Sequence, residues 1–385
     1  MVMSTLNDNF MWQFPLFDPQ HPLPWAALES RYDWLRDMRG VPQDPEWHGE
    51  GDVWIHTQMV AEALVALPEF QALDAEKQHK VFAAALLHDV EKRSTTATEW
   101  IDDRERITAK GHAKKGEATT RAFLYQEEAA PFFVREEIAQ LVRWHGTPLH
   151  AISGADPRKT VIETSCLTDT RLLGMLARAD VLGRIAPDRE ELLLHTHLFD
   201  ELCKEHACFG EPRQFPSEYG RFLYLSRPDY SPDYEPYNDL AFEVTLMSGL
   251  PGAGKDTWLR QHNDLPVVSL DQIRRDMRID PSDRRKNGQV IQAAKERARV
   301  FLRKKQPFVF NATNVTADIR SIWINLFLEY KARVKIVYIE VPYLQLTQQN
   351  QNREHVVPAS TLERLIRKLD PPTVLEAHSV EHRVS

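Results

Sequence analysis

The sequence contains few cysteines, since Cys166, Cys203 and Cys208 are the only three among its 385 residues. None of them forms a Cys-x-x-Cys pair, and the short cluster of Cys203, His206 and Cys208 has no second pair of ligands to complete a zinc site. We therefore expect no disulfide framework, and unpaired thiols are typical of a reducing compartment.

Long apolar segments are also missing. No stretch of the chain reaches the length of apolar residues that is needed to span a bilayer. Residues 1–17 lack the basic start and the apolar run of a secretory signal. We therefore expect a cytoplasmic protein that has no membrane partner.

An excess of positive charge is absent as well. The chain has 48 Lys and Arg against 56 Asp and Glu, which gives a formal net charge of −8. This balance excludes a protein that coats nucleic acid indiscriminately, but binding a nucleic-acid end needs only a few local cations. The length and the 42% hydrophobic content are sufficient for two cores.

Apolar residues recur at helical spacing through the first half of the chain. Few segments there alternate with a period of two, so no sheet is expected in this region. Residues 1–209 are therefore predicted to form an all-α bundle. Its principal helices are expected over residues 53–67, 75–90, 111–123, 136–144 and 169–182.

Residues 210–240 are rich in Pro, Tyr and Asp. Proline at this density interrupts helices and central strands, so we interpret the segment as an interdomain linker. From residue 241 to residue 385, strand-like and helix-like segments alternate, which predicts a parallel sheet flanked by helices. The expected fold is thus multidomain, all-α and then α/β. Strands are expected over residues 242–247, 266–270, 307–310 and 334–341.

Metal-ligand residue types occur in order on the predicted helices. His56 lies early in one helix, His88 and Asp89 lie at the end of the next, and Asp180 lies on a later one. Imidazole and carboxylate ligands suit Mn²⁺, Fe²⁺, Co²⁺, Ni²⁺ or Zn²⁺, and we expect one or two ions because Asp89 can bridge. Such a cation polarises a phosphoryl oxygen and activates water, so the set indicates hydrolysis of a phosphate ester with Asp89 as a catalytic residue.

Four more polar residues follow in the same region. His112 and His145 fit a second metal ion or the substrate phosphate. Lys92 and Arg93 follow the His-Asp doublet directly, where their cations could hold the phosphate of the hydrolysed ester. A lone histidine on a helix is more often structural than a ligand, and only the ordered set favours a metal site here.

This ordered set resembles the HD phosphohydrolase superfamily, an all-helical fold whose H…HD…D ligands hold one or two metal ions. The segments 50–57, 85–89 and 111–112 are similar to those of the HD domains attached to tRNA nucleotidyltransferases. Glu91 departs from that pattern, because glycine often follows the His-Asp doublet at this place in the family, and the departure alters the expected phosphate pocket.

A glycine-rich loop follows the first strand of the α/β region and precedes a helix. Its spacing is that of a Walker A loop, in which backbone N–H groups face the phosphates and the lysine reaches the outer ones. We therefore expect ATP, or another nucleoside triphosphate, together with Mg²⁺. Asp256 stands where Ser or Thr usually contacts the magnesium ion, and Thr257 follows it. The expected nucleotide-binding residues of the loop are Gly249, Gly252, Ala253, Gly254, Lys255, Asp256 and Thr257.

An acidic and a basic residue come after the second predicted strand. Asp271 is expected at its carboxyl end, facing the phosphates, where a carboxylate can accept a proton from an attacking hydroxyl. Arg274 lies one helical turn further on and could hold an acceptor phosphate. Taken alone, the pair would better be read as a helix cap and an exposed arginine.

The loop and the D-x-x-R string together resemble 5′-OH polynucleotide kinases, including the bacteriophage enzyme. The resemblance implies that Asp271 is the general base, that Lys255 is catalytic, and that Arg274 contacts the acceptor strand. An arginine in the family's lid contacts the donor phosphates, which points to Arg353 in the lid-like segment 348–358. Asn311 replaces the Asp more usual in related small kinases, and no catalytic role is assigned to it.

The order of the two regions resembles the bacterial bifunctional end-healing enzymes. That resemblance implies removal of 2′,3′-cyclic phosphate or 2′-phosphate from RNA ends, and transfer of the ATP γ-phosphate to 5′-OH ends of RNA or DNA, with a ligase as a further partner. The alternative is an HD nucleotide phosphohydrolase fused to a kinase for nucleosides or metabolites. A third alternative is a nucleotide-sensing scaffold without enzymatic activity.

Overall fold

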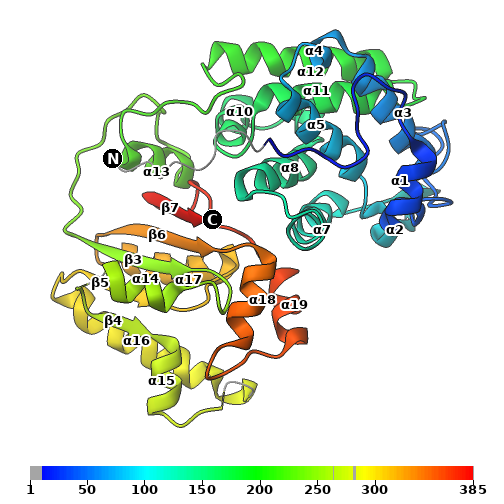
Figure 1. Ribbon diagram of the computed structural model, residues 1–385. Coiled ribbons are helices and arrows are strands. Elements are labelled where there is room, and N and C mark those ends of the chain that lie inside the picture. Colours follow the sequence, from blue (N-terminus) through cyan, green and yellow to red (C-terminus); the bar gives the residue numbers. More distant parts are fainter. Residues whose placement is uncertain (1–10, 263, 281–282, 385) are drawn as a thin grey trace. The chain divides into compact units, whose positions relative to one another are not determined.

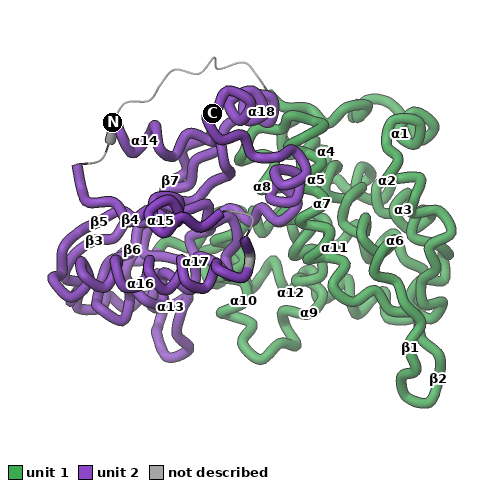
Figure 2. The backbone as a smooth tube through the Cα atoms, turned by 90° about the horizontal axis from the view of Figure 1, so that it is seen from below, with its two compact units in different colours: residues 1–214 green, residues 215–385 purple. Residues whose placement is uncertain are grey.

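The computed structural model describes residues 11–262, 264–280 and 283–384. Its contacts divide the chain into two compact units, Met1–Gln214 and Phe215–Ser385, which are described separately (Figure 2). In the part of the chain that the structure describes, no helix combines the length and the apolar character needed to cross a membrane.

The first unit is predominantly helical, as the sequence predicts. Asp residues begin four of its helices, because their side chains accept hydrogen bonds from backbone N–H groups of the first turn; for example, Asp52 bonds Ile55 and Asp74 bonds Lys77, each at 2.9 Å. The helices are α1 (Trp25–Arg31), α2 (Asp33–Arg36), α3 (Val53–Ala66), α4 (Pro68–Gln71), α5 (Ala75–Leu87), α6 (Lys92–Thr95), α7 (His112–Gln126), α8 (Phe132–Trp144), α9 (Thr147–His150), α10 (Pro157–Ser165), α11 (Thr170–Leu182) and α12 (Arg189–Glu205).

The core of this unit lies between α3, α5, α8 and α11. Helix α5 is almost entirely buried between residues 81 and 87, and α11 is buried along nearly its whole length. Apolar burial on this scale fixes the ends of the helices relative to one another. The residues at those ends are therefore held in place by the core.

A β-hairpin interrupts the helical unit, contrary to the expectation that this region has no sheet. Strands β1 (Ala97–Ile101) and β2 (Arg104–Thr108) pair antiparallel. Asp102 and Asp103 turn the chain with φ of 51° and 58°, as two-residue hairpins require. The strands are mainly polar or exposed on both faces, so the sequence lacks the alternation that would have predicted them. Figure 2 shows the hairpin projecting from the unit.

The second unit contains a five-stranded parallel sheet in the order β4-β5-β3-β6-β7 (Figure 1). The predicted α/β architecture is confirmed. The strands are β3 (Phe242–Ser248), β4 (Val267–Ser269), β5 (Phe308–Asn311), β6 (Ala332–Glu340) and β7 (Ser379–Val384). The helices are α13 (Glu218–Ser226), α14 (Lys255–His262), α15 (Leu270–Asp276), the 3-10 turn η1 (Arg284–Lys286), α16 (Asn287–Arg303), α17 (Ala317–Leu328), α18 (Tyr343–Gln351) and α19 (Ala359–Ile366).

The topology of this sheet brings three chain segments together at one edge. Strand β3 pairs with β5 and β6, and β4 pairs with β5, so that Ser269 lies opposite Asn311. In parallel strands the carboxyl ends share one edge of the sheet. The glycine-rich loop after β3, the start of α15 after β4 and Asn311 at the end of β5 therefore meet there.

Two elements of the second unit were not expected. Strand β7 adds a fifth strand, and helix α13 lies inside the segment 210–240 that the composition indicates as a linker. Helix α13 lies beside β7 in Figure 1, and Arg221 donates a hydrogen bond of 2.6 Å to the carbonyl of His378. Much of the proline-rich segment therefore packs on the second unit.

Two candidate active sites

The first candidate site lies where α3, α5 and α11 meet. His56 comes from the first turn of α3, His88 caps the end of α5, and Asp180 lies near the end of α11. One ligand atom from each lies within 4.8 Å of the other two. His56 Nε2 is 3.1 Å from Asp180 Oδ1 and 3.4 Å from His88 Nε2. These three side chains form the first ligand group.

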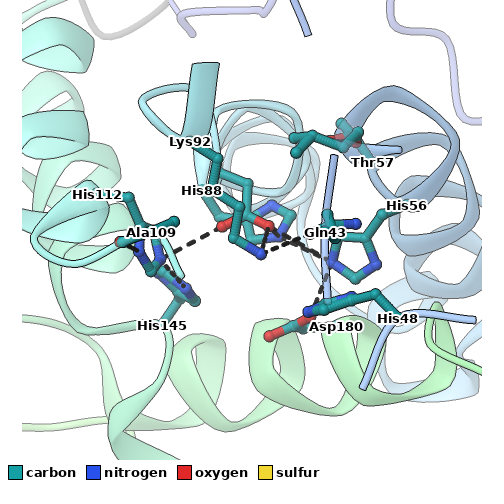
Figure 3. A network of polar contacts seen from close by, with 12 residues as sticks. Gln43, His48, His56, Thr57, His88, Lys92, Ala109, His112, His145 and Asp180 are labelled. Atoms are coloured by element: carbon teal, nitrogen blue, oxygen red, sulfur yellow. Dashed lines mark hydrogen bonds and ion pairs between the residues drawn. The ribbon is translucent and has the colours of Figure 1, made fainter. Parts of the chain in front are cut away.

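A second ligand group lies beside the first. It consists of Asp89, of His112 at the start of α7 and of His145 at the end of α8. Asp89 Oδ1 is 3.4 Å from His112 Nε2, and Asp89 Oδ2 is 3.2 Å from His88 Nε2. Asp89 thus connects the two groups, and Figure 3 shows His112 and His145 on one side of the network with His56 and Asp180 on the other.

The imidazole rings are oriented by hydrogen bonds at Nδ1. Nδ1 of His88, His112 and His145 bonds the carbonyl oxygen three residues earlier in each case, at 2.8, 2.7 and 2.8 Å. Because these carbonyls only accept, Nδ1 carries the proton and Nε2 presents a lone pair. His112 Nε2 and His145 Nε2 are 3.4 Å apart, and two lone pairs repel at that distance unless a cation lies between them.

The charges around the groups also fit a bound cation. Asp89 Oδ1 is buried and accepts no hydrogen bond from any residue that the structure describes. Burial alone would raise the pKa of Asp89, but its polar surroundings, with the ammonium of Lys92 at 2.8 Å, hold it well below its usual range. Burial opposes a charge on His56, yet the neighbouring Asp180 and Glu50 raise its pKa. The donor set therefore suits one or two divalent transition metals.

The pKa of His145 also fits a site that binds a metal ion. Burial lowers it to about 3, so the ring is neutral at physiological pH. A neutral imidazole is the form that coordinates a metal ion.

Glu50 contacts His56 of the first ligand group, and no role was assigned to Glu50 from the sequence. Its Oε1 is 2.9 Å from His56 Nδ1 and 2.8 Å from His48 Nδ1, and its Oε2 accepts the backbone N–H of Ile185 at 2.9 Å. A carboxylate on the outer nitrogen of a metal-binding histidine fixes its tautomer and ring orientation. The only indication of this role in the sequence was that an acidic residue precedes His56 within the segment 50–57.

The two cations expected to hold the ester phosphate lie in different places. Lys92 Nζ lies 2.8 Å from Asp89 Oδ2 and donates to Gln43 at 2.8 Å, so it borders the ligand groups. Arg93 instead bonds Asp37 at 2.8 Å and lies 3.5 Å from Glu91. The structure thus brings Lys92 to the site and does not bring Arg93 there.

Glu91 occupies the place where glycine was expected. Its side chain is buried and binds Thr119 at 2.8 Å, Lys115 at 3.1 Å and the hydroxyl of Ser94. These contacts tie α6 to α7 away from the ligand groups. Glu91 therefore acts as a structural link between the two helices.

A cavity of about 190 Å³ opens beside the ligand groups. Its lining includes the polar residues Lys92, His48 and His112 and the apolar residues Trp47 and Ile107. The hairpin contributes Ile107, so it forms part of the wall. The volume admits a phosphate group with part of an attached sugar or base.

The second candidate site is the loop between β3 and α14. Gly249, Gly252 and Gly254 have φ of 145°, 87° and 103°, which favour glycine. A Cβ at Gly249 would lie 2.3 Å from the carbonyl oxygen of Ile339, so no larger residue fits there. Such a backbone turns successive N–H groups toward one point, as phosphate binding requires.

Lys255 lies in a cavity of about 630 Å³ that the loop forms with the start of α15, the end of β5 and the segment around Arg353. Its Nζ donates to the carbonyls of Gly249 and Leu250 at 2.7 and 2.9 Å. Burial lowers the pKa of Lys255 to about 8. An ammonium at a cavity wall that is bonded to neutral carbonyls attracts an anion.

The proposed base, Asp271, lies at this cavity, and the proposed acceptor-binding residue, Arg274, lies next to it. Asp271 lines the cavity, and its carboxylate is 3.3 Å from Nη1 of Arg274. Arg274 also donates to Asn287 at 3.3 Å, while its Nε is buried and bonds no described residue. Of the loop residues expected to bind nucleotide, Gly252, Gly254, Lys255, Asp256 and Thr257 line the cavity, whereas Ala253 is buried.

A contact that the sequence did not indicate joins the loop to β5. Asn311 donates from Nδ2 to Asp256 Oδ1 at 2.8 Å. The two residues are 55 positions apart in the sequence. They meet because strands β3 and β5 pair side by side in the sheet. Nothing in the linear sequence pairs them.

Comparison with known proteins agrees with this division. Residues 53–185 match the family model of the HD domain, and residues 244–372 match that of the AAA domain. The chain therefore carries an HD hydrolase domain and a kinase-like P-loop domain. No curated protein matches it significantly.

Two solved structures resemble parts of the chain. A candidate kinase from Chloroflexus aurantiacus J-10-fl is 18% identical, covering 38% of this chain and 86% of its own, with a TM-score of 0.33. A sugar kinase from Janibacter sp. HTCC2649 is 16% identical, covering 37% of this chain and 85% of its own, with a TM-score of 0.30. Likenesses this weak establish no shared activity.

Proposed function

We propose that the chain heals broken nucleic-acid ends. In this proposal the HD domain hydrolyses 2′,3′-cyclic phosphate or 2′-phosphate at RNA ends, and the P-loop domain phosphorylates 5′-OH ends from ATP. The observation that carries the proposal is Asp271 at the phosphate cavity with Arg274 beside it at 3.3 Å, on a chain that also holds two metal-ligand groups joined by Asp89.

At the first site the two ligand groups hold the metal ions, with His56, His88 and Asp180 in one and Asp89, His112 and His145 in the other. A divalent cation held by these residues would supply polarisation of a phosphoryl oxygen and activation of water. Lys92 offsets the charge of the phosphate, because its ammonium lies at the border of the groups and of the adjoining cavity.

At the second site Lys255 binds the outer phosphates of the nucleotide, and Arg353 stabilises the transferred group from the facing side of the cavity. Asp271 takes the proton from the attacking hydroxyl. Arg274 fixes the carboxylate of Asp271 and offers its guanidinium to the acceptor phosphate. Asp271 is 69% exposed, which leaves room for a polymer end.

The hairpin supports nucleic acid as the substrate of the first site. Trp100 is 74% exposed. It pairs with Glu105, and the alternation of strand faces puts it on the same face as Ile107, which lines the cavity beside the metal ligands. An exposed indole at this place can stack on a base next to the scissile phosphate.

The direct test is transfer of label from γ-labelled ATP to a 5′-OH RNA oligonucleotide, a 5′-OH DNA oligonucleotide, a nucleoside and a free sugar. We expect label on the oligonucleotides only. Label on the nucleoside or the sugar, with none on the oligonucleotides, would replace the proposal with the small-molecule kinase. ATP turnover with no labelled acceptor would favour the nucleotide sensor.

A further inference from the structure

The ammonium of Lys92 is held by two acceptors beside the ligand groups of the first site. Its Nζ lies 2.8 Å from Asp89 Oδ2 and donates to Gln43 Oε1 at 2.8 Å. An ammonium group has three N–H donors, and no residue in the described ranges accepts from the third. Because Lys92 lines the cavity beside the ligand groups, this third donor is available to a ligand in that cavity.

Gln43 reaches the ammonium from a different part of the chain. It lies 49 positions before Lys92, and both residues belong to the polar network in Figure 3. The chain next to Gln43 is fixed, because Asp44 accepts a hydrogen bond of 3.1 Å from Arg106. Asp89 is only three residues before Lys92 and, acting alone, would leave the ammonium free to move around one carboxylate oxygen. Gln43 supplies the second point that fixes its position.

The orientation of the Gln43 amide follows from the chemistry of its partner. A protonated lysine only donates, so Oε1 of Gln43 must face Lys92. The side chain is 8% exposed, and its Nε2 is buried and bonds no residue that the structure describes. Among the described residues, the contact with Lys92 is therefore the one hydrogen bond through which this side chain can act.

A neutral acceptor also suits the charge of this place. Asp89 already offsets the positive charge of Lys92, and a second carboxylate beside the ammonium would weaken its attraction for a phosphate. The amide oxygen of Gln43 fixes the ammonium without adding a charge. We propose that Gln43 is a positioning residue, which holds Lys92 so that its third N–H binds the phosphate of the hydrolysed ester. This inference rests on the proposed phosphoesterase activity of the HD domain.

The test compares wild type with Gln43→Met, which removes the acceptor and keeps the length of the side chain, and with Gln43→Glu, which adds a negative charge. KM and kcat are measured for an RNA with a terminal 2′,3′-cyclic phosphate and for bis(p-nitrophenyl) phosphate, and binding of inorganic phosphate is measured by calorimetry. A contact made equally in the ground state and the transition state changes KM more than kcat. We expect Gln43→Met to raise KM and the phosphate dissociation constant about tenfold, as loss of one hydrogen bond to a charged group does, and Gln43→Glu to raise both further. Bound metal, measured by elemental analysis, should not change.

Two further proteins separate positioning from a structural role. Gln78→Met is the matched control, because Gln78 is also 8% exposed and donates to the carbonyl of Phe70 at 3.1 Å, away from the cavity. It should leave KM unchanged. The second is the double variant with Lys92→Ala. If Gln43 acts through Lys92, Gln43→Met should lower kcat/KM little further once the lysine is absent.

Two results would overturn the inference alone. Gln43→Met with lowered thermal stability but normal KM and phosphate affinity would make the contact structural. Equal losses from Gln43→Met with and without Lys92 would show that the glutamine does not act through the lysine. Wild type that hydrolyses neither substrate and binds no phosphate would remove the proposed phosphoesterase as well, whereas hydrolysis of bis(p-nitrophenyl) phosphate but not of RNA, with the effect of Gln43→Met intact, would refute only the proposed RNA substrate.

Discussion

The HD site and the P-loop site differ in how completely the protein assembles them. In the HD site His56, His88 and Asp180 are fully buried, and their orientations are fixed by the surrounding hydrogen bonds. In the P-loop site Asp271 is largely exposed and Lys255 bonds carbonyls of its own loop. Buried carboxylates persist only beside a counter-charge, which Lys92 and Arg184 supply to Asp89 and Asp180, so the first site is held in place by the protein itself, whereas the second is open to solvent.

The largest effect is expected from Asp89→Ala, which removes the carboxylate shared by the two ligand groups. Because metal polarisation contributes several kcal/mol, phosphate release should fall by about 10³-fold or more. Bound metal, measured by elemental analysis, should fall with it. Transfer from ATP should be unchanged, and exposed Glu190→Ala serves as the control in the same unit. Loss of both activities in Asp89→Ala would contradict two independent sites.

In the P-loop site, Asp271→Asn should reduce 5′-phosphorylation by about 10²–10⁴-fold, the usual contribution of a general base. ADP binding and phosphate release should be retained, and label transfer to a 5′-OH oligonucleotide measures the loss. Asp276→Asn is the matched control, because Asp276 lies on the same helix, is exposed, and bonds Arg297. If Asp271→Asn phosphorylated the oligonucleotide at the wild-type rate, a group other than Asp271 would have to accept the proton.

A smaller effect is expected from Glu50→Gln, which keeps the shape of the side chain but removes the negative charge behind His56. Metal affinity and phosphate release should fall by about 10–100-fold, as is typical when the partner of a metal-binding histidine is changed. Metal titration followed by calorimetry measures this, with Glu190→Gln as the control. Equal metal affinity in wild type and Glu50→Gln would show that burial alone orients the ring.

Trp100→Ala tests whether the hairpin belongs to the first site. Base stacking on an aromatic side chain contributes about 1–3 kcal/mol, so KM for RNA ends should rise by about tenfold. KM for a phosphodiester without a base should not change. Phe133→Ala provides an exposed aromatic control on α8. Equal effects on both substrates would remove Trp100 from substrate binding.

An effect on stability alone, with no effect on either activity, is expected at His378 in the second unit. Its Nδ1 accepts the backbone N–H of Val334 at 3.0 Å, and burial lowers its pKa from 6.5 to about 4. In the unfolded chain His378 therefore binds a proton below about pH 6.5, whereas in the folded chain it binds one only below about pH 4. Stability is full above pH 6.5 and is lost as the pH falls through this window, by about 3 kcal/mol at most.

His378→Gln keeps an acceptor for Val334 and does not titrate. Its free energy of unfolding in denaturant should therefore change less between neutral and acid pH than that of wild type. The same pH dependence in both proteins would show that other groups cause the acid sensitivity of this unit.

The sequence predicted the features that depend on periodicity and on motif spacing. The long helices 53–67 and 75–90, the strand 242–247 and the glycine-rich loop fall where apolar periodicity and glycine placement put them. The hairpin β1–β2 was missed because its strands are polar on both faces. Strand β7 was missed at the end of the chain, where its apolar signal is short and mixed with charges.

Within the sites, the residue types and their order could be predicted from the sequence, while the contacts between them come from the fold. The five histidine and aspartate positions beyond His56 converge because buried helices fix the ends of α5, α8 and α11. The pairing of Asp256 with Asn311 depends on strand order, which no local pattern encodes. Glu50 and His56 are close in the sequence, and they meet across the start of α3.

The most direct test of two opposite activities on one strand uses a single RNA with a 5′-OH at one end and a 2′,3′-cyclic phosphate at the other. Incubated with ATP and divalent metal, wild type should add a phosphate to the first end and remove the phosphate from the second, as mass spectrometry of the product shows. Asp89→Ala should yield only the 5′-phosphorylated strand, and Lys255→Ala only the strand freed of its terminal phosphate. Wild-type protein that leaves both ends unaltered while it turns over mononucleotides or free sugars would contradict the account.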